Sequence, residues 1–412
     1  MRSERSPQNR GVSRRDVLRR GAVATAIAGF GLSSLTGSAA AGGTGGTGVP
    51  DDAIPIDGPT EITEPGYYVL TKDIVSKTNT VVIAVEPGTD DVTIDGQGHT
   101  IKGPGKDIFG SVGIDVGEYT DANTNDPVVK NVIVTGFDIG IEFGDTNRGL
   151  ISNVKVTHCD WGIYLLENRD LTIADSIVAK NNDAFFQDEG SPGLALLRNR
   201  ITRNDIVGTI DFADESVVAD NRIDYNDSGF GFSNSSGLRV TGNLFYQNRE
   251  GFDISEYVGV GSDNVIRGNR FIENERYGID IDGSDSGLGD VVIEENDVFR
   301  NGSDGVKLRG VRGPSTVSKN RAIGNGGDGV LLSGSDQTEI VGNLVRQNAG
   351  DGIELRSAQF SDDGSDDNVV RENIIRENGD LAIRIDELST GNVVENNQIG
   401  DDAPDTCRLE DY

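Results

Sequence analysis

The chain has 412 residues, a formal net charge of −31 and 56 glycines, and only 35% of its residues are hydrophobic. This acidic balance, with no basic patch, makes nucleic acid and acidic membrane surfaces poor partners. Arg outnumbers Lys by 28 to 9. A Lys-poor, acidic surface on an ordered fold indicates a halophilic protein, because high salt screens the self-repulsion of its charges.

Residues 1–41 have the layout of an export signal. The twin-arginine motif Ser13–Leu18 is followed by a mild apolar run, Gly21–Leu35, and by small residues up to Ala41. This order predicts a signal peptide of the twin-arginine route, which exports folded proteins. The run is too short and too rich in Gly and Ala to span a bilayer. We therefore expect an extracellular or cell-surface protein without a membrane span.

The rest of the chain is predicted to hold one structural domain. Residues 1–41 carry seven Arg and two acidic residues, so the remainder has 30 basic and 66 acidic residues, a net charge of −36. Residues 42–59 are predicted as a Gly-rich linker and lead-in. The solenoid described below is expected over residues 60–400, and the acidic tail 401–412 is expected to cover its last open edge.

A short pattern returns through residues 196–399: an Asn, a second Asn five residues later, and usually a Gly four residues after that. Successive first Asn residues lie 22 to 30 positions apart, which is typical of a solenoid with insertions at one place. The pairs are Asn199/Asn204, Asn221/Asn226, Asn243/Asn248, Asn269/Asn274, Asn296/Asn301, Asn320/Asn325, Asn343/Asn348 and Asn373/Asn378.

Apolar residues keep a fixed place in each repeat. They stand three residues before the first Asn, as at Val240 and Ile266, and two residues after it, as at Phe245 and Phe271. After the Gly they alternate, as at Ile279 and Ile281, which is typical of short β-strands. We predict an all-β fold: a single-stranded, right-handed parallel β-helix of about 12 coils of 22–30 residues. The Asn side chains are expected to bond from coil to coil, and Asn and Gly to supply the left-handed corners.

These motifs resemble a known family. The N-x4-N-x3-G-[IV] unit is similar to that of the parallel β-helix repeat family, which includes pectate-lyase-like proteins. The segments Pro65–Leu70 and Val92–Ile101 resemble the first coils of NosD-like β-helix proteins. The resemblance covers roughly residues 60–400 and implies the fold. It implies little about activity, because this scaffold hosts lyases, hydrolases, epimerases, binding proteins and adhesins.

Metal-ligating residues are scarce, apart from carboxylates. Copper sites use His, Cys or Met, and the chain has only His99, His158, two Cys and Met1. A copper-delivery role of the NosD type is therefore not supported by composition. Calcium takes carboxylate and carbonyl oxygens, and Asp304, Asp328 and Asp351 precede the Gly in three successive coils. A calcium site here competes with the simpler interpretation of acidic surface charge and Asp-Gly turns.

The outward positions of the Gly-Ile-x-Leu strands form the candidate substrate face. One column holds Glu142, Tyr164, Asp280, Lys307, Leu331, Glu354 and Arg384, and the next holds Asp282, Arg309, Ser333, Arg356 and Asp386. In an enzyme acting on uronate chains, Lys307, Arg309 and Arg356 would neutralise the carboxylate, with Asp280 and Asp282 holding an ion. Tyr164, Glu354 and Arg384 are candidate substrate-binding residues.

Two alternatives compete for the same residues. Asp280 and Asp282 are a candidate carboxylate pair for glycoside hydrolysis. Alternatively, the acids and bases pair between neighbouring coils, with Arg309 on Asp282 and Arg356 on Asp386, and only keep a charged ladder from repelling itself. Asn234 is the sequon Asn expected to accept glycosylation, because Asn226 and Asn301 belong to the repeat.

Three functions remain open at the sequence level. The first is a monomeric, secreted β-helix protein that binds extended carbohydrate, such as a polysaccharide or cell-surface glycan, or serves as a surface scaffold without catalysis. The second is a polysaccharide lyase or glycoside hydrolase acting on acidic polysaccharide. The third is a NosD-like accessory protein for metal-centre assembly, which only the resemblance supports. No cofactor is required by the first function, and calcium is the candidate ion.

Overall fold

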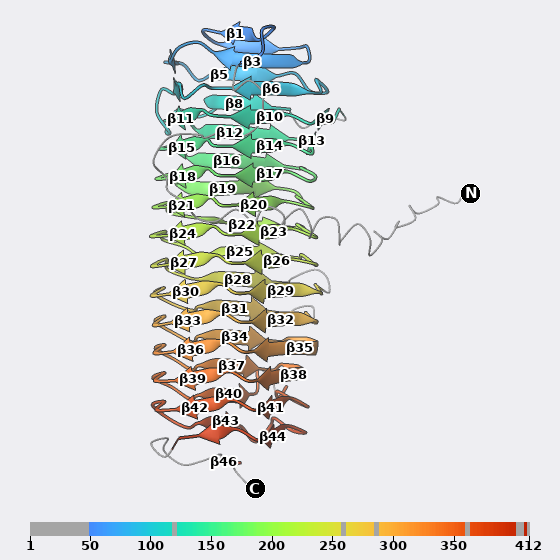
Figure 1. Cartoon of the computed structure of the whole chain (residues 1–412), viewed down its shortest axis with the longest axis vertical. Coiled ribbons are helices and arrows are strands. Elements are labelled where there is room, and N and C mark those ends of the chain that lie inside the picture. The colour runs from blue at the N-terminus through green and yellow to red at the C-terminus, as the bar shows by residue number, and fades with distance from the viewer. Residues whose placement is uncertain are drawn as a thin grey trace, which may run out of the picture. The chain divides into compact units, whose positions relative to one another are not determined.

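A computed structural model of the chain describes residues 49–117, 122–256, 261–283, 288–358 and 363–400, and the backbone of 408–409. Val49–Tyr412 form one compact unit, and Figure 1 shows it as a stack of short strands in which each coil lies on the next. The predicted export signal, most of the predicted linker, and Cys407 in the acidic tail lie outside the described residues.

The stack has three faces, which are made of parallel sheets whose strands come from successive coils. The first face is one 15-stranded sheet. Its strands are β1 (Ile54–Ile56), β3 (Gly66–Leu70), β6 (Val92–Asp95), β10 (Val128–Lys130), β14 (Leu150–Ser152), β17 (Thr172–Ala174), β20 (Ala195–Leu197), β23 (Val217–Ala219), β26 (Arg239–Thr241), β29 (Asn264–Arg267), β32 (Val291–Glu294), β35 (Arg312–Ser318), β38 (Asp336–Val341), β41 (Val369–Arg371) and β44 (Val393–Glu395).

The second face is one 14-stranded sheet. Its strands are β4 (Ile74–Val75), β7 (Thr100–Lys102), β11 (Ile133–Thr135), β15 (Lys155–Thr157), β18 (Ile177–Ala179), β21 (Arg200–Thr202), β24 (Arg222–Asp224), β27 (Leu244–Tyr246), β30 (Arg270–Ile272), β33 (Asp297–Phe299), β36 (Arg321–Ile323), β39 (Leu344–Arg346), β42 (Ile374–Arg376) and β45 (Gln398–Ile399). A two-stranded sheet, β9 (Thr124–Asn125) with β13 (Thr146–Asn147), lies beside the early coils.

The third face consists of a six-stranded and a nine-stranded sheet, joined by a bridge between Asp183 and Ile206. The six strands are β2 (Thr60–Ile62), β5 (Val81–Val85), β8 (Val112–Val116), β12 (Ile139–Gly144), β16 (Trp161–Leu166) and β19 (Asp183–Asp188). The nine are β22 (Gly208–Asp211), β25 (Phe230–Ser233), β28 (Phe252–Ser255), β31 (Ile279–Asp282), β34 (Val306–Arg309), β37 (Val330–Ser333), β40 (Ile353–Arg356), β43 (Ile383–Ile385) and β46 (Arg408–Leu409).

The predicted fold class is confirmed: the described chain is a right-handed parallel β-helix without helices. It has about 14 turns rather than the predicted 12, because the two long sheets hold 15 and 14 strands. The first strand already begins at Ile54, and the coils before residue 131 carry the strand pattern without the Asn pair that marks the later repeats. Counting Asn pairs therefore underestimates the number of coils.

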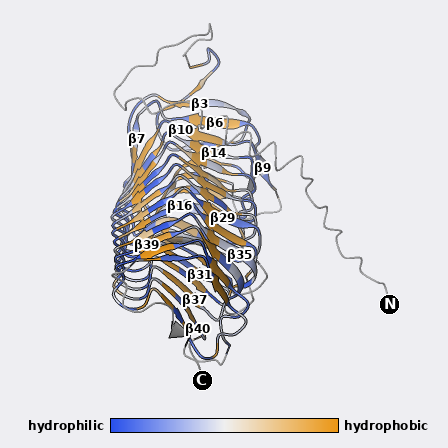
Figure 2. Cartoon of the chain, turned by 60° about the horizontal axis from the view of Figure 1, so that its bottom comes forward, coloured by the Kyte–Doolittle hydropathy of each residue, from blue (hydrophilic) through white to orange (hydrophobic). Residues whose placement is uncertain are grey.

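The core is a single column of inward side chains that runs through the stack. Buried residues from Ile56 to Ile385 form one contiguous hydrophobic cluster, and the predicted column residues Val240, Ile266 and Phe245 are fully buried within it. Figure 2 shows hydrophobic stretches concentrated in the stacked strands and hydrophilic residues in the turns between them. Each coil buries its apolar residues only by stacking on its neighbours, as solenoid repeats do.

Two ladders of buried Asn join the coils, as predicted. Asn296 is representative: its Oδ1 accepts the backbone N–H of Asn269 at 2.9 Å, and its Nδ2 donates to the carbonyl of Ile266 at 2.8 Å and to Asn320 Oδ1 at 2.9 Å. The second ladder repeats this arrangement through Asn274. The ladders satisfy buried corner groups that the strands leave unpaired.

Gly and some Asn residues do supply left-handed corners, as at Gly242 (φ 66°) and Asn153 (φ 50°), but the ladder Asn residues do not. That conformation belongs to the residue just before each ladder Asn, for example Arg198 at φ 54° and Glu295 at φ 56°. The ladder Asn must instead aim its amide inward at the next coil. In the early coils Asn131 and Asn153 themselves occupy this left-handed position, with Val132 and Val154 in the ladder position.

Candidate functional site

The third face carries the predicted outward columns in register. Asp280 is the strand partner of Lys307, and Asp282 is the partner of Arg309. The columns continue to Glu354, Arg384 and Arg356 as the sequence indicated. Asp386 lies after the end of β43, so it is not a strand member of its column.

A cleft of about 280 Å³ opens on this face over strands β22 to β34. Three of the predicted catalytic residues, Asp280, Asp282 and Arg309, line it, whereas Lys307 and Arg356 do not. The lining comprises Thr209, Glu250, Gly251, Phe252, Asp253, Ser255, Arg276, Tyr277, Asp280, Asp282 and Arg309. Lys307 lies beside the cleft, with its Nζ 4.3 Å from the centre of the Tyr277 ring.

The cations of the cleft are all paired with carboxylates. Arg309 contacts Asp282 at 3.2 Å and Asp280 at 3.6 Å, and Lys307 contacts Asp280 at 3.7 Å. Arg276 forms an ion pair with Glu250. The charge-pairing alternative is therefore correct for Arg309, although this residue also lines a cleft.

Arg356 departs from both predictions made for it. It pairs with Glu354 at 3.3 Å, on its own strand. The predicted partner, Asp386, instead accepts the backbone N–H groups of Ser357 and Ser389, and these bonds hold the pKa of Asp386 below its usual value despite burial. Arg356 is thus neither over the cleft nor bound to Asp386.

Sequence reasoning missed Asp253, which lies in the cleft on β28. Its strand partners are Gly231 in the preceding coil and Asp280 in the following one. Burial, together with the negative charges of Asp280 and Glu250, raises the pKa of Asp253 to about 7. Burial also raises the pKa of Asp280, although Lys307 and Arg309 lower it. The signal was present, because Gly251-Phe252-Asp253-Ile254 repeats the Gly-Ile-x-Ile pattern of the next coil.

Aromatic side chains gather on the same face, nearer the N-terminus. Trp161 stacks on Phe186 with ring centres 4.1 Å apart and planes 3° apart, and Tyr164 packs at 5.3 Å from Trp161. We call these three half-buried residues the aromatic platform. Tyr164, a predicted substrate-binding residue, belongs to it. Phe185, which directly precedes Phe186, is buried in the core.

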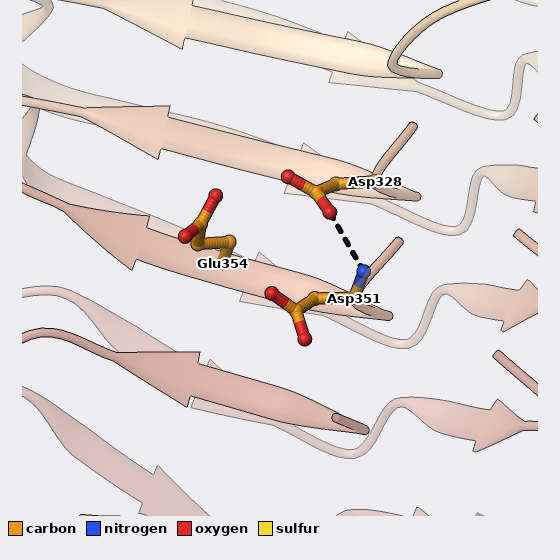
Figure 3. Close-up of side chains that lie close together, drawn as sticks. All are labelled: Asp328, Asp351 and Glu354. Carbon is orange, nitrogen blue, oxygen red and sulfur yellow. Dashed lines mark hydrogen bonds between the residues drawn. The ribbon is translucent and has the colours of Figure 1, made fainter. Parts of the chain in front are cut away.

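The predicted calcium residues lie on neighbouring coils but bond to the backbone. Asp304 Oδ1 accepts the N–H of Asp328, Asp328 Oδ1 that of Asp351, and Asp351 Oδ1 that of Leu381, at 2.7–2.8 Å. Among the described residues, one group of three carboxylates offers ligand atoms within 4.8 Å of one another: Asp328, Asp351 and Glu354 (Figure 3).

This acidic group is partly neutralised by Arg384. The guanidinium Nε donates to Asp351 at 2.6 Å and lies 3.9 Å from Glu354. Burial and the hydrogen bond with Glu354 raise the pKa of Asp328 to about 8. Arg384, predicted to bind substrate, is thus engaged with these carboxylates. Calcium binding by Asp304, Asp328 and Asp351 stays a prediction, and Glu354 is a further carboxylate that lies with Asp328 and Asp351.

Copper does not fit the described residues. His99 Nδ1 lies 3.2 Å from Asp73, while His158 is an exposed corner residue at φ 57°. Cys159 is fully buried, and burial raises the pKa of its thiol to about 11, which disfavours the thiolate that metals bind.

The side-chain amide of Asn234, the predicted glycosylation site, already makes a hydrogen bond. Asn234 Nδ2 donates to Asp211 Oδ1 at 2.8 Å, so modification would break this bond, and it stays a prediction. Asn226 and Asn301 are buried in the second ladder, as expected. In the described part of the chain, no helix has the length and apolarity needed to cross a membrane.

Comparison with known proteins places the chain in a family. The family model described as "Periplasmic copper-binding protein (NosD)" matches residues 72–261 and 254–403. A search of the curated proteins finds no match.

Solved structures with a similar fold include the following three. A double mutant of the periplasmic alginate epimerase AlgG is 15% identical, with TM-score 0.45 over 84% of this chain and 77% of that one. The AlgE4 A-module, a mannuronan C-5 epimerase of Azotobacter vinelandii, is 16% identical, with TM-score 0.38 over 84% and 90%. The GH87 α-1,3-glucanase of Streptomyces thermodiastaticus is 12% identical, with TM-score 0.45 over 85% and 70%.

At these identities the likeness to the solved structures is one of fold alone. The family model, in contrast, spans most of the chain and most of the β-helix described above. The chain belongs to the NosD family of parallel β-helix proteins.

Proposed function

We propose that this protein is exported and binds an extended, hydroxyl-rich carbohydrate along the third face of the β-helix. The observation that carries the proposal is that the cleft and the aromatic platform lie on one continuous outward column. Tyr164 pairs with Phe186, the column crosses to β22 at the bridge of Asp183 and Ile206, and it then runs to Asp253.

The spacing of the two features suits an extended chain. Phe186 on β19 and Asp253 on β28 are three coils apart, or roughly 14 Å at about 4.8 Å per coil. A linear polysaccharide lying along the stack would reach both. The rings of the aromatic platform offer apolar faces for sugar rings, and the carboxylates and guanidinium groups of the cleft can bond to sugar hydroxyls.

A neutral carbohydrate fits better than an acidic one. Arg276, Lys307 and Arg309 already have carboxylate partners, so none is poised to neutralise a uronate. The chain without residues 1–41 has a net charge of −36, which repels a polyanion except in high salt. Lyase action on uronate chains is less favoured for the same reason.

Export is supported by the twin-arginine pattern and by the word "periplasmic" in the family description. The acidic, Lys-poor composition supports a high-salt habitat. A role in assembling a copper centre lacks support from the described His and Cys residues. A scaffold that spaces other proteins remains the second candidate, favoured by the length of the stack.

Affinity electrophoresis in gels that contain neutral or uronate-rich polysaccharides, at low and at high salt, tests the proposal. We expect retardation by a neutral polysaccharide and its loss in Trp161→Ala and Arg276→Ala. Arg270→Ala, an exposed residue on the second face, is the matched control and should be retarded like wild type. Migration unaffected by every polysaccharide would refute carbohydrate binding and favour the scaffold.

A further inference from the structure

The carboxyl group of Asp253 occupies space that the preceding coil leaves open. A Cβ on Gly231, its strand partner, would lie 2.4 Å from the carboxyl carbon and from both oxygens. Gly231 is not among the residues with positive φ, so its backbone conformation does not require glycine. The missing side chain at Gly231 serves instead to accommodate the Asp253 carboxyl group.

Asp253 differs from every other carboxylate of the cleft in its partners. Glu250, Asp280 and Asp282 each contact a cation. Asp253 makes no hydrogen bond or ion pair with the part of the chain that the structure describes. A half-buried carboxyl group without a partner is costly, and such a cost is typical of a group that acts on a ligand.

The environment of Asp253 suits a proton donor. With a pKa of about 7, the group is protonated in a large fraction of molecules at neutral pH, which is the condition for general-acid catalysis. Asp280 lies between it and Arg309, and its negative charge is one cause of the raised pKa. Asp280 is thus a positioning residue that keeps the proton on Asp253.

Asp282 has a different environment. It forms an ion pair with Arg309 at 3.2 Å, and its side chain is 28% exposed, so water can reach it. Asp282 lies one coil on from Asp253 and two residues further along the strand. The two Cα atoms are therefore diagonal neighbours, roughly 8 Å apart. Side chains on diagonal rather than directly opposed positions leave a gap between their carboxyl groups, and a sugar with a water molecule beside it needs such a gap; in inverting glycosidases the two carboxyl groups lie about 6.5–9.5 Å apart.

We propose that the cleft hydrolyses a glycosidic bond with inversion, with Asp253 as the general acid and Asp282 as the general base. The proposal rests on the carbohydrate binding proposed above. It specifies the type of reaction. It also replaces Asp280 by Asp253 in the candidate catalytic pair, so that the pair becomes Asp253 and Asp282.

Water is the only co-reactant in this reaction. Asp253 transfers its proton to the glycosidic oxygen as the bond from that oxygen to the anomeric carbon breaks. A water molecule attacks the anomeric carbon from the opposite side, and Asp282 takes the proton that this water loses. The products are a released hydroxyl group and a sugar with inverted anomeric configuration. Solvent returns the proton from Asp282 to Asp253.

The test uses the mature protein and the neutral polysaccharide that it binds most tightly. New reducing ends measure cleavage, and affinity electrophoresis measures binding in the same samples. We expect Asp253→Asn to bind like wild type and to cleave at least about 100-fold more slowly, the usual contribution of a general acid. Asp297→Asn is the matched control. It removes an outward carboxylate that pairs with Arg321 on the second face, and it should cleave like wild type.

Two further measurements separate catalysis from structure. An aryl glycoside with an acidic phenol as leaving group needs no proton donor, so Asp253→Asn should cleave it at a rate close to that of wild type. Nuclear magnetic resonance of the first product should show the inverted anomer. A retained anomer, or equal loss on both substrates, would overturn the assignment. Binding without cleavage by wild type would overturn hydrolysis and leave carbohydrate binding intact, whereas absence of binding would overturn both.

Discussion

The hydrogen bonds of the first Asn ladder allow us to predict how much stability Asn296→Ala should lose. The substitution removes the acceptor of the Asn269 backbone N–H and the donor to the carbonyl of Ile266, while Asn320 keeps the bond from the backbone N–H of residue 296. All these groups are buried. An orphaned buried N–H costs about 1–3 kcal/mol and the lost bond to the carbonyl about 1 kcal/mol. We expect a loss of about 2–4 kcal/mol in the free energy of unfolding.

Chemical denaturation followed by circular dichroism measures this loss, and amide hydrogen exchange at Asn269 locates it. Arg270→Ala is the control, because its side chain is exposed on the adjacent strand, and it should change stability by less than about 0.5 kcal/mol. If Asn296→Ala unfolds at the same denaturant concentration as Arg270→Ala, the ladder does not stabilise the stack as argued.

Four other predictions follow from the site and the charge. Burial raises the folded-state pKa of Asp253 and of Glu256 to about 7 and that of Asp328 to about 8. The free energy of unfolding should therefore be highest near pH 4. It should fall as the pH rises from there to about 7 to 8, because the unfolded chain loses these protons before the folded chain does. Melting scans should show this fall, and an unchanged slope in Asp253→Asn would contradict it. Gly231→Ala should cost about 1–3 kcal/mol by overpacking, and Asp253→Ala in the same chain should recover most of that loss; a double-mutant cycle with no coupling would refute the contact. Melting temperature should rise with salt, because screening relieves the net charge of −36; a fall with salt would contradict a halophilic surface. Calcium should raise the melting temperature of wild type but not of Glu354→Gln, and identical scans with calcium and with chelator would exclude a site there.

The fold could be predicted from the sequence because its repeats are local. The Asn spacing and the alternation at Ile279 and Ile281 recur in each coil, and stacking equivalent positions leaves little freedom in register. The coil number was underestimated. Asn and Gly were expected at the left-handed corners, but several corners hold other residues, such as Arg198 and Glu295.

The site was predictable only in part. The strand register brought Asp280, Asp282 and Arg309 together as expected, because in-register stacking follows from the repeat. Asp253 was missed, since its importance depends on the space left by Gly231 and on the lack of an ion pair between Asp253 and the described residues. Neither property can be recognised in one repeat alone. The partner of Arg356 was wrong because Asp386 lies beyond the end of β43, where backbone N–H groups compete for its carboxylate.

Calorimetric titration with a length series of a neutral oligosaccharide tests the central claim most directly. If one extended chain occupies the third face, affinity should rise with length until the ligand spans the roughly 14 Å between Asp253 and the aromatic platform. Trp161→Ala should then abolish the gain from length while leaving the binding of short ligands unchanged. An affinity independent of length, or equally reduced for short and long ligands in Trp161→Ala, would contradict a single extended binding face.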